Sequence, residues 1–449
     1  MPRRREPEIA TIDAFSHDGR GIAAIEGKKV FVPGVLPGER LRMVRRKVHR
    51  GYDEAELLEV LVPSPQRLEP RCTAFGVCGG CALQHVSAGK QRHIKEQALR
   101  DSLKRVGGVA PQRWLEPLFD PLPESGWQYR RRARLAVRDV SAKGRVLVGF
   151  REQHTTLIAD MHRCEVLVSP LDGLIEPLSE LIGSLSIRKR LPQIEVAAAD
   201  NATELVFRVL DPPSPEDREK LQRFGFEQGL RISLQPGGTD TLQPLYPESP
   251  AEALFYELPQ FDLRIHFKPV DFIQVNGAVN RLLVAAAVEL LQLKENDRVL
   301  DLFCGIGNFS LPLARRAGHV LGIEGTAVQV SRAQSNAVLN DIGNCDFRCA
   351  DLAAVDGREG WLRQDWHGVL LDPPRSGADA VVRHMKRLGP ERIVYVSCHP
   401  ATLARDARVL TAEQGYVLEA AGIVDMFPHT AHTEAIAVFA RSPRRGGRK

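Results

Sequence analysis

Long hydrophobic runs are absent from this sequence of 449 residues. No stretch comes near the roughly 18 consecutive apolar residues that a membrane-spanning helix requires. The opening residues, MPRRREPE, are charged and lack the apolar segment of a secretory signal peptide. We therefore expect a cytoplasmic protein without a membrane partner, and no stable protein partner is implied.

The sequence also lacks the low apolar content of a disordered chain. It has 43% hydrophobic and 26% charged residues, which is ordinary for a globular protein. Because one domain typically holds about 100 to 200 residues, a chain of this length should contain two or three hydrophobic cores. A single small module is excluded.

The eight cysteines do not indicate a secreted disulfide framework, because such frameworks belong to short extracellular chains. In a long chain without a signal peptide, metal binding or catalysis is the better interpretation. The cysteines are therefore candidate ligands or nucleophiles.

Positive charge is clustered although the net charge is only +5. The basic runs are Arg3–Arg5, Arg40–Arg50, Arg130–Arg138 and residues 444–449. Such runs are usually solvated faces, but four of them, rich in arginine, favour a polyanionic partner over a small metabolite. Nucleic acid is the expected partner.

The pattern of apolar residues predicts three domains. In residues 1–63, short alternating strands separated by HDGRG, EGKK and PGVLPGE predict a small antiparallel β-barrel. Residues 64–260 begin with a cysteine cluster and have mixed helix and strand patterns, which predicts an α+β domain. In residues 261–449, apolar strands alternate with helices, so we expect an α/β domain with a parallel, doubly wound sheet.

A glycine-rich loop in the third domain predicts a nucleotide-like ligand. The segment RVLDLFCGIGNFS is a strand, a turn with Gly305 and Gly307, and the start of a helix. The next strand ends at Glu324, where an acid can accept hydrogen bonds from ribose hydroxyls. A dinucleotide fingerprint requires a third glycine or alanine where Ser310 stands. Asp301 suits a cationic methionine group, which favours S-adenosylmethionine (SAM). A glycine turn without a ligand is the alternative.

Two reactive side chains follow later strands of this domain. Asp372 comes directly after the strand GVLL, and Cys398 comes directly after RIVYVS. Ligands of open α/β sheets bind at the carboxyl ends of the strands. Cys398 could be an ordinary packed thiol, but a strand end is also where a nucleophile is displayed.

Five motifs together resemble the RNA uracil-5-methyltransferase family. They are FIQVN (272–276), DLFCGIGNFSLPLA (301–314), DPPR (372–375), SCHPATLARD (397–406) and MFPHTAHTE (426–434). The family has SCNP where this chain has His399. That difference puts the local hydrogen bonding in question rather than the reaction. The resemblance implies a class I SAM-dependent methyltransferase fold for the C-terminal domain.

The resemblance also implies a mechanism and its residues. A thiolate of Cys398 adds to uracil C6, C5 takes the methyl group of SAM, and Glu434 removes the C5 proton. The implied cofactor-binding residues are Gln274, Phe303, Asn308, Glu324, Asp351 and Asp372. Asp372 would also help to hold the base. Gln274 and Asn308 could instead cap turns, and Asp351 could be a surface acid.

A cysteine cluster follows the N-terminal segment. Its members form a C-x5-C-x2-C pattern: Cys72, Cys78 and Cys81. The first gap is too wide for an ordinary zinc ribbon. Resemblance to the iron–sulfur members of the family implies Cys164 as the fourth ligand and a [4Fe-4S] cluster. Zinc and unliganded thiols are the alternatives, with His85 and His162 as alternative ligands or solvated loop histidines.

The substrate is implied by resemblance as well. Residues 8–47 resemble a TRAM domain, an RNA-binding barrel, and this domain together with the cysteine cluster implies a uridine of 23S rRNA as the target. The target base would be flipped into a pocket between domains, while the basic segments bind phosphates. The alternatives are a methyltransferase acting on tRNA or another rRNA site, a barrel that serves only as a spacer, and a non-catalytic RNA-binding protein.

Overall fold

The structure is a computed structural model that describes residues 6–16, 18–122 and 124–442. The arginine-rich runs predicted at the two ends, 3–5 and 444–449, lie outside the described residues. Within the described part of the chain, none of the helices combines the length and apolar character needed to cross a bilayer.

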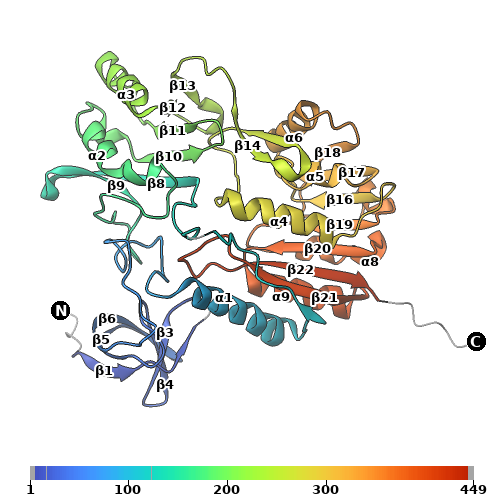
Figure 1. Ribbon diagram of the computed structural model, residues 1–449, viewed down its shortest axis with the longest axis horizontal. Coiled ribbons are helices and arrows are strands. Elements are labelled where there is room, and N and C mark those ends of the chain that lie inside the picture. Colours follow the sequence, from blue (N-terminus) through green and yellow to red (C-terminus); the bar gives the residue numbers. More distant parts are fainter. Residues whose placement is uncertain (1–5, 17, 123, 443–449) are drawn as a thin grey trace, which may run out of the picture.

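The N-terminal segment forms a curved six-stranded sheet around its own small core (Figure 1). Its strands are β1 (Glu8–Thr11), β2 (Ala14–Phe15), β3 (Gly21–Ile25), β4 (Lys28–Val32), β5 (Arg40–Val48) and β6 (Tyr52–Val62). The strand order is β1-β5-β6-β4-β3-β2. Val30, Leu41 and Met43 are fully buried in this core, which explains the alternation of apolar and polar residues in the sequence.

The basic run 40–50 is largely neutralised inside this sheet. Arg45 binds Glu8 at 2.8 Å and the buried Asp53 at 2.9 Å. Neighbouring pairs on β5 and β6 are Arg42 with Glu59, Arg46 with Glu56, and Lys47 with Glu54. The run therefore forms a cross-strand ladder of ion pairs in which Arg42, Arg46 and Lys47 stay exposed, and its contact with phosphates stays a prediction.

The middle of the chain forms a second six-stranded sheet, in the order β13-β12-β11-β10-β8-β9. The strands are β8 (Arg132–Val140), β9 (Arg145–Gly149), β10 (Gln193–Ala198), β11 (Thr203–Arg208), β12 (Arg231–Gln235) and β13 (Gln243–Tyr246). Helices α2 (Ile175–Gly183) and α3 (Pro215–Gln228) pack on it and share its core (Figure 1).

The C-terminal part contains an eight-stranded sheet in the order β18-β17-β16-β19-β20-β22-β21-β7. Its C-terminal strands are β16 (Arg298–Leu302), β17 (His319–Glu324), β18 (Cys345–Cys349), β19 (Gly368–Leu371), β20 (Arg392–Ser397), β21 (Tyr416–Val424) and β22 (Glu434–Arg441). Strands β16 to β20 are parallel, and β22 runs antiparallel between β20 and β21.

Helices cover both faces of this sheet, which gives it two separate cores. One core includes side chains of α4 (Gly277–Leu290), α5 (Ser310–Ala314) and α6 (Ala327–Leu339). The other includes side chains of α7 (Asp379–Val382), α8 (Met385–Leu388) and α9 (Pro400–Ala412). The predicted doubly wound α/β sheet is confirmed. Its order reverses beside β16, between β17 and β19, and ligands of such sheets bind there.

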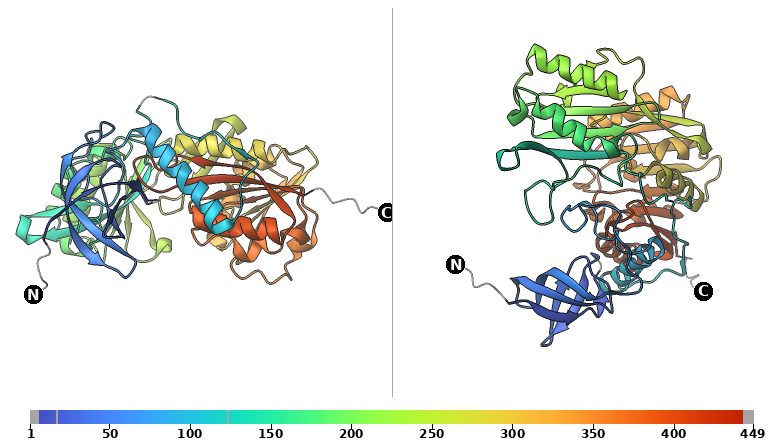
Figure 2. Two further views of the ribbon diagram at one scale, coloured as in Figure 1. Left: turned by 90° about the horizontal axis from the view of Figure 1, so that it is seen from below. Right: turned by 60° about the vertical axis from the view of Figure 1, so that its left-hand side comes forward.

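Two elements from early in the chain complete the C-terminal sheet. Strand β7 (Arg113–Trp114) pairs in parallel with β21, and helix α1 (Ala88–Ser102) buries Leu99 in the same core as α9. Figure 2 shows α1 lying against the C-terminal part rather than the central sheet. The hairpin of β14 (Leu254–Leu258) and β15 (Leu263–Phe267) also joins the core of α4 and α6.

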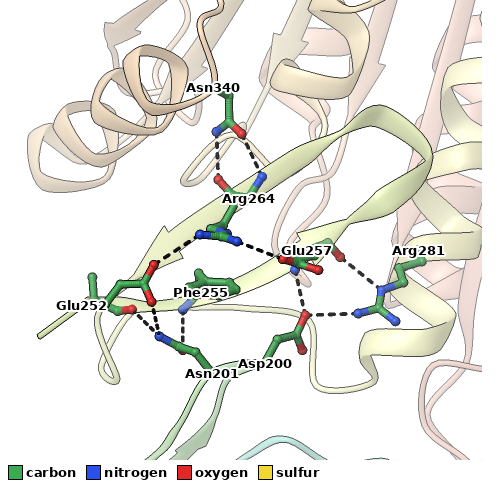
Figure 3. A network of polar contacts seen from close by, with 9 residues as sticks. Asp200, Asn201, Glu252, Phe255, Glu257, Arg264, Arg281 and Asn340 are labelled. Atoms are coloured by element: carbon green, nitrogen blue, oxygen red, sulfur yellow. Dashed lines mark hydrogen bonds and ion pairs between the residues drawn. The ribbon is translucent and has the colours of Figure 1, made fainter.

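A polar network fixes the central sheet to the C-terminal part (Figure 3). Asp200, in the turn between β10 and β11, accepts hydrogen bonds from the Glu257 backbone N–H at 2.8 Å and from Arg281 at 3.1 Å. Asn340, at the end of α6, bonds both the N–H and the carbonyl of Arg264 at 2.8 Å. The hairpin β14–β15 is therefore held from both sides.

The second basic run, 130–138, contributes to the same junction. Arg131 pairs with Asp200. Arg132 binds Glu195 at 3.1 Å and donates to the Val270 carbonyl at 2.8 Å. Arg132 thus crosses the junction and Arg131 holds Asp200 in place, so these two arginines are engaged within the protein, and phosphate binding by the run stays a prediction.

Candidate active site

The glycine-rich loop lies between β16 and α5 and has a left-handed backbone. Gly305 has φ 56° and Gly307 has φ 96°, values that glycine adopts at little cost. Phe303 also has a positive φ, 67°, which costs a non-glycine residue about 1–3 kcal/mol. The N–H groups of Phe303 and Cys304 both donate to the Ile323 carbonyl, at 2.9 and 3.1 Å. These bonds to β17 hold the strained turn in place.

Glu324, the predicted ribose acid, ends β17 beside this loop. One carboxylate oxygen accepts the Gly305 N–H at 3.1 Å, and the other accepts the Gly325 N–H at 2.7 Å. Each carboxylate oxygen has a second lone pair that remains available for a hydroxyl donor. The structure thus places Glu324 where the sequence predicted it, and its contact with a ribose stays a prediction.

Asp301 is fully buried near the end of β16, and its side chain contacts Ser310, the residue that begins α5 after the glycine-rich loop. Ser310 donates to one of its oxygens, and the other oxygen has no hydrogen-bond partner among the described residues. Burial, with added repulsion from Asp372 and Glu324, raises the pKa of Asp301 to about 8. Three carboxyl groups therefore converge at this edge, which favours a cationic ligand over a pyrophosphate.

The remaining predicted cofactor residues surround the loop. Asn308 exchanges two hydrogen bonds of 3.0 Å with Asn280 and accepts one of 2.9 Å from Tyr256, so its amide is fixed against α4 and β14. Gln274 is half-buried just before α4. Asp351 is exposed after β18 and accepts the Ala353 N–H at 2.9 Å. All three lie on elements adjoining the loop, and their roles stay predictions.

Strand register brings the predicted nucleophile and base together. Antiparallel β20 and β22 pair Ser397 with Ala435, which places Cys398 beside Glu434. Asp372 follows β19, the parallel neighbour of β20 on its other side. A thiol and two carboxyl groups that are far apart in sequence thus meet at the carboxyl edge of the sheet.

Burial and mutual repulsion shift the pKa values of these groups upward. Burial raises the pKa of Glu434 to about 8, with repulsion from Asp372 in addition. Burial alone raises the pKa of Asp372 to about 7. Burial, then Glu434 and Asp372, raise the pKa of the Cys398 thiol to about 11. Both carboxyl groups can therefore exchange protons near neutral pH, as general acid–base catalysis requires.

Arg375, which the sequence argument did not single out, moderates this negative charge. Its guanidinium lowers the pKa of both Cys398 and Glu434, and it lies 3.2 Å from His432 Nδ1. Arg375 belongs to the quoted motif DPPR, and His432 belongs to MFPHTAHTE. Their location in these two motifs was the sequence signal that could have identified Arg375 and His432 as residues of the site.

His399 stands where the family has asparagine, and the structure shows which hydrogen bonds it makes there. It is the N-cap of α9, and its Nδ1 accepts the Thr402 N–H at 3.3 Å. Asparagine caps helices with its side-chain oxygen in the same way. The substitution therefore preserves the cap.

The four predicted ligand cysteines are gathered at one edge of the central core. Cys78 and Cys164 are buried, and Cys72 and Cys81 pack against the same cluster. Burial raises the pKa of all four thiols, to about 12 for Cys81 and about 11 for Cys164, and repulsion from other thiols is a smaller cause for Cys78, Cys81 and Cys164. All are free thiols. Within the described residues, however, no three Cys, His, Asp or Glu side chains are arranged to hold a metal ion.

The two histidines considered as alternative ligands differ in position. His162 is exposed and pairs with Glu176. His85 is fully buried, with its ring centroid 5.4 Å from that of Phe75. Neither histidine is among a set of side chains arranged around a metal ion in the described part of the chain.

Known proteins resemble this chain in its C-terminal region, over nearly its whole length, and in its fold. The family model described as tRNA (Uracil-5-)-methyltransferase matches residues 251–442. The 23S rRNA (uracil(1939)-C(5))-methyltransferase RlmD of Methylococcus capsulatus is 48% identical, covering 98% of each chain. The RlmD of Nitrosococcus oceani is 49% identical, covering 98% of this chain and 97% of its own.

A solved structure supports the fold. The tRNA (uracil-54, C5)-methyltransferase of Pyrococcus abyssi, in complex with S-adenosyl-L-homocysteine, superposes with a TM-score of 0.72. It is 23% identical and covers 96% of this chain and 100% of its own. With the full-length relatives, these matches confirm the resemblance: the chain belongs to the RNA (uracil-5-)-methyltransferase family.

Proposed function

We propose that this protein transfers a methyl group from SAM to C5 of a uracil in 23S rRNA, the position that the names of its relatives number 1939. The observation that carries the proposal is the placement of Cys398 beside the buried Glu434 by the register of β20 and β22. A ribosomal substrate also places the activity in the cytoplasm.

The reaction requires a nucleophile because C5 of uracil is not reactive enough by itself. The Cys398 thiolate forms a bond to C6, and the electron pair of the C5–C6 double bond becomes available at C5. That pair attacks the methyl group of SAM, and S-adenosylhomocysteine leaves with the sulfur electron pair. Burial and the two neighbouring carboxyl groups raise the pKa of the Cys398 thiol to about 11. The cationic sulfonium of SAM would lower that pKa, as a nearby positive charge does.

Elimination then restores the uracil ring. The Glu434 carboxylate takes the proton from C5, the C5–C6 double bond forms again, and the thiolate leaves C6. A pKa near 8 makes Glu434 a stronger base than an ordinary carboxylate. Asp372 raises that pKa by repulsion, which is how it supports the base without contacting the proton.

The cofactor substrate occupies the glycine-loop edge in this proposal. Asp301 and Asp372 provide negative charge for the sulfonium and amino groups, and Glu324 binds the ribose. The other residues proposed to contact SAM are Gln274, Phe303, Asn308 and Asp351. The N-terminal sheet serves as a TRAM-like RNA-binding domain, and the target uridine is flipped out of its stack to reach Cys398.

Tritium release distinguishes the possible substrates. Unmodified 23S rRNA carrying [5-3H]uridine is expected to release tritium with SAM, because the C5 hydrogen leaves in every turnover. Transcripts with cytidine at position 1939 should lose the methylation while other uridines stay unreacted. Release from tRNA instead of rRNA would replace the substrate and keep the mechanism. No release from either RNA would overturn the enzymatic function.

We further propose that Cys72, Cys78, Cys81 and Cys164 hold a [4Fe-4S] cluster. The chemistry of the donor set supports this proposal, because thiolates are the ligands of such clusters and these four free thiols belong to or pack against one apolar core. Such a cluster would join residues 72–81 to the central sheet and stabilise the surface that faces RNA.

Metal analysis tests this second proposal. Protein purified without oxygen is expected to contain about four iron and four sulfide per chain and to absorb visible light. Cys78→Ser should lose the iron and bind RNA more weakly while SAM binding persists, whereas Cys349→Ser, at an exposed thiol outside the cluster, should change neither. Zinc in place of iron, or full RNA affinity without metal, would contradict the proposal.

A further inference from the structure

The loop between β21 and β22 is held from both the cysteine segment and helix α1. Within it, His429 is buried and has φ 63°, an unusual left-handed conformation for histidine. Its carbonyl accepts the N–H groups of Ala82 and Leu83, both at 2.9 Å. These two residues directly follow Cys81. The loop therefore forms part of the same hydrogen-bonded unit as the cysteine segment.

Gln91, on α1, hydrogen-bonds to both parts of this unit. Its side-chain oxygen accepts the His429 N–H at 2.8 Å. Its side-chain nitrogen lies 3.2 Å from His429 Nδ1, and it donates to the carbonyls of Leu83 and Val86 at 3.0 and 2.8 Å. Gln91 is only 1% exposed. One amide thus binds the loop and the cysteine segment at the same time.

Aromatic contacts from the central domain complete the enclosure of His429. The ring of Trp127 stacks on the imidazole, with centroids 3.8 Å apart. Tyr129 donates its hydroxyl to the Pro428 carbonyl at 3.1 Å. His429 is therefore fixed in backbone and in side chain, and Glu434 begins β22 a few residues later.

The nucleophile is not hydrogen-bonded to Gln91 or to His429. Cys398 follows β20 and precedes α9, whose cap is formed by His399. A displaced loop would move Glu434, the first residue of β22, more than it moves Cys398. Gln91 and His429 hydrogen-bond to the loop before Glu434 and to the cysteine segment, so the direct anchor of the base extends into distant parts of the chain, although α1 also packs on α9.

We propose that Gln91 and His429 are positioning residues that place Glu434 for removal of the C5 proton. The inference rests on the proposed function, and neither residue contacts the substrate. Disturbing this unit should slow elimination, the step that uses Glu434, more than thiol addition, the step that uses Cys398. A misplacement of about 1 Å can cost about a hundredfold in rate.

Gln91→Leu tests the proposal, because leucine fills a similar volume without the four polar contacts. Turnover on uracil RNA is expected to fall about 10- to 100-fold, while a covalent Cys398–RNA adduct accumulates on denaturing gels. Addition to 5-fluorouracil RNA should keep its normal rate, since fluorine blocks the proton removal in any case. Gln97→Leu is the matched control, on the exposed face of the same helix.

Two further measurements keep the outcomes separate. His429→Asn, which tolerates a left-handed backbone, should show a smaller defect of the same kind. Turnover equal to that of Gln97→Leu would overturn the proposal, and so would a parallel loss of addition, turnover and thermal stability, because that result indicates only a folding defect. If the unaltered protein forms no adduct with 5-fluorouracil RNA and releases no tritium, the proposed function itself fails.

Discussion

Cys398→Ala is expected to abolish methylation while the fold and SAM binding persist. Without the thiol, C5 of uracil is not activated, and removal of a covalent nucleophile costs on the order of 10⁴-fold or more in turnover. The side chain is only partly buried at a strand end, so its loss leaves the core intact. Tritium release from rRNA measures the effect, and calorimetric titration with SAM reports cofactor binding.

Glu434→Gln is the paired variant that separates the two reacting groups. It should still form the covalent adduct and transfer the methyl group, but the adduct should persist because no carboxylate removes the C5 proton. Cys345→Ala, at the start of β18 and so at the opposite end of that strand from the proposed site, should match the unaltered protein in turnover. Measurable turnover by Cys398→Ala would show that another group is the nucleophile.

The largest expected loss of stability follows from Lys95→Met. The Lys95 ammonium donates to Asp425 at 2.7 Å and to the Phe427 carbonyl at 2.8 Å, and both charged side chains are buried. Methionine would leave the Asp425 carboxylate buried without a counter-charge, which typically costs about 3–5 kcal/mol of unfolding free energy. Urea unfolding, followed by circular dichroism, measures the change.

The double variant Lys95→Met with Asp425→Leu is the control for this prediction. It removes both charges, so it should recover much of the stability lost in the single variant, because an apolar pair of similar volume can replace a buried ion pair at little cost. A single variant that loses less than about 1 kcal/mol would mean that water or a rearranged side chain reaches Asp425.

The sequence allowed prediction of the C-terminal sheet and of the edge where its loops meet. The apolar strands are short and continuous, so their ends could be located, and Asp372 and Cys398 follow those ends directly. Gly305 and Gly307 also predicted a turn, and in the structure both have a left-handed backbone. These features are local, which is why residue patterns reveal them.

Long-range pairing could not be predicted in the same way. The sequence suggested that the basic runs face a partner, but Arg45 and Arg132 instead meet acids on neighbouring strands. Nor did the pattern of α1 show which sheet it covers, because an amphipathic helix packs equally well on any apolar face. The hydrogen bonds around His429 join residues more than 300 positions apart, and no local periodicity encodes them.

The position of α1 and β7 within the C-terminal sheet sets the order in which the molecule can be assembled. The helix and strand are synthesised well before β21, Asp425 and β22, since Lys95 and Asp425 are 330 positions apart. Closing such a long loop is slow compared with forming local contacts. The nascent chain must therefore keep one apolar helix face uncovered until β21 and β22 have also been synthesised, so the proposed site of this rRNA-modifying enzyme is completed only after both distant segments are available.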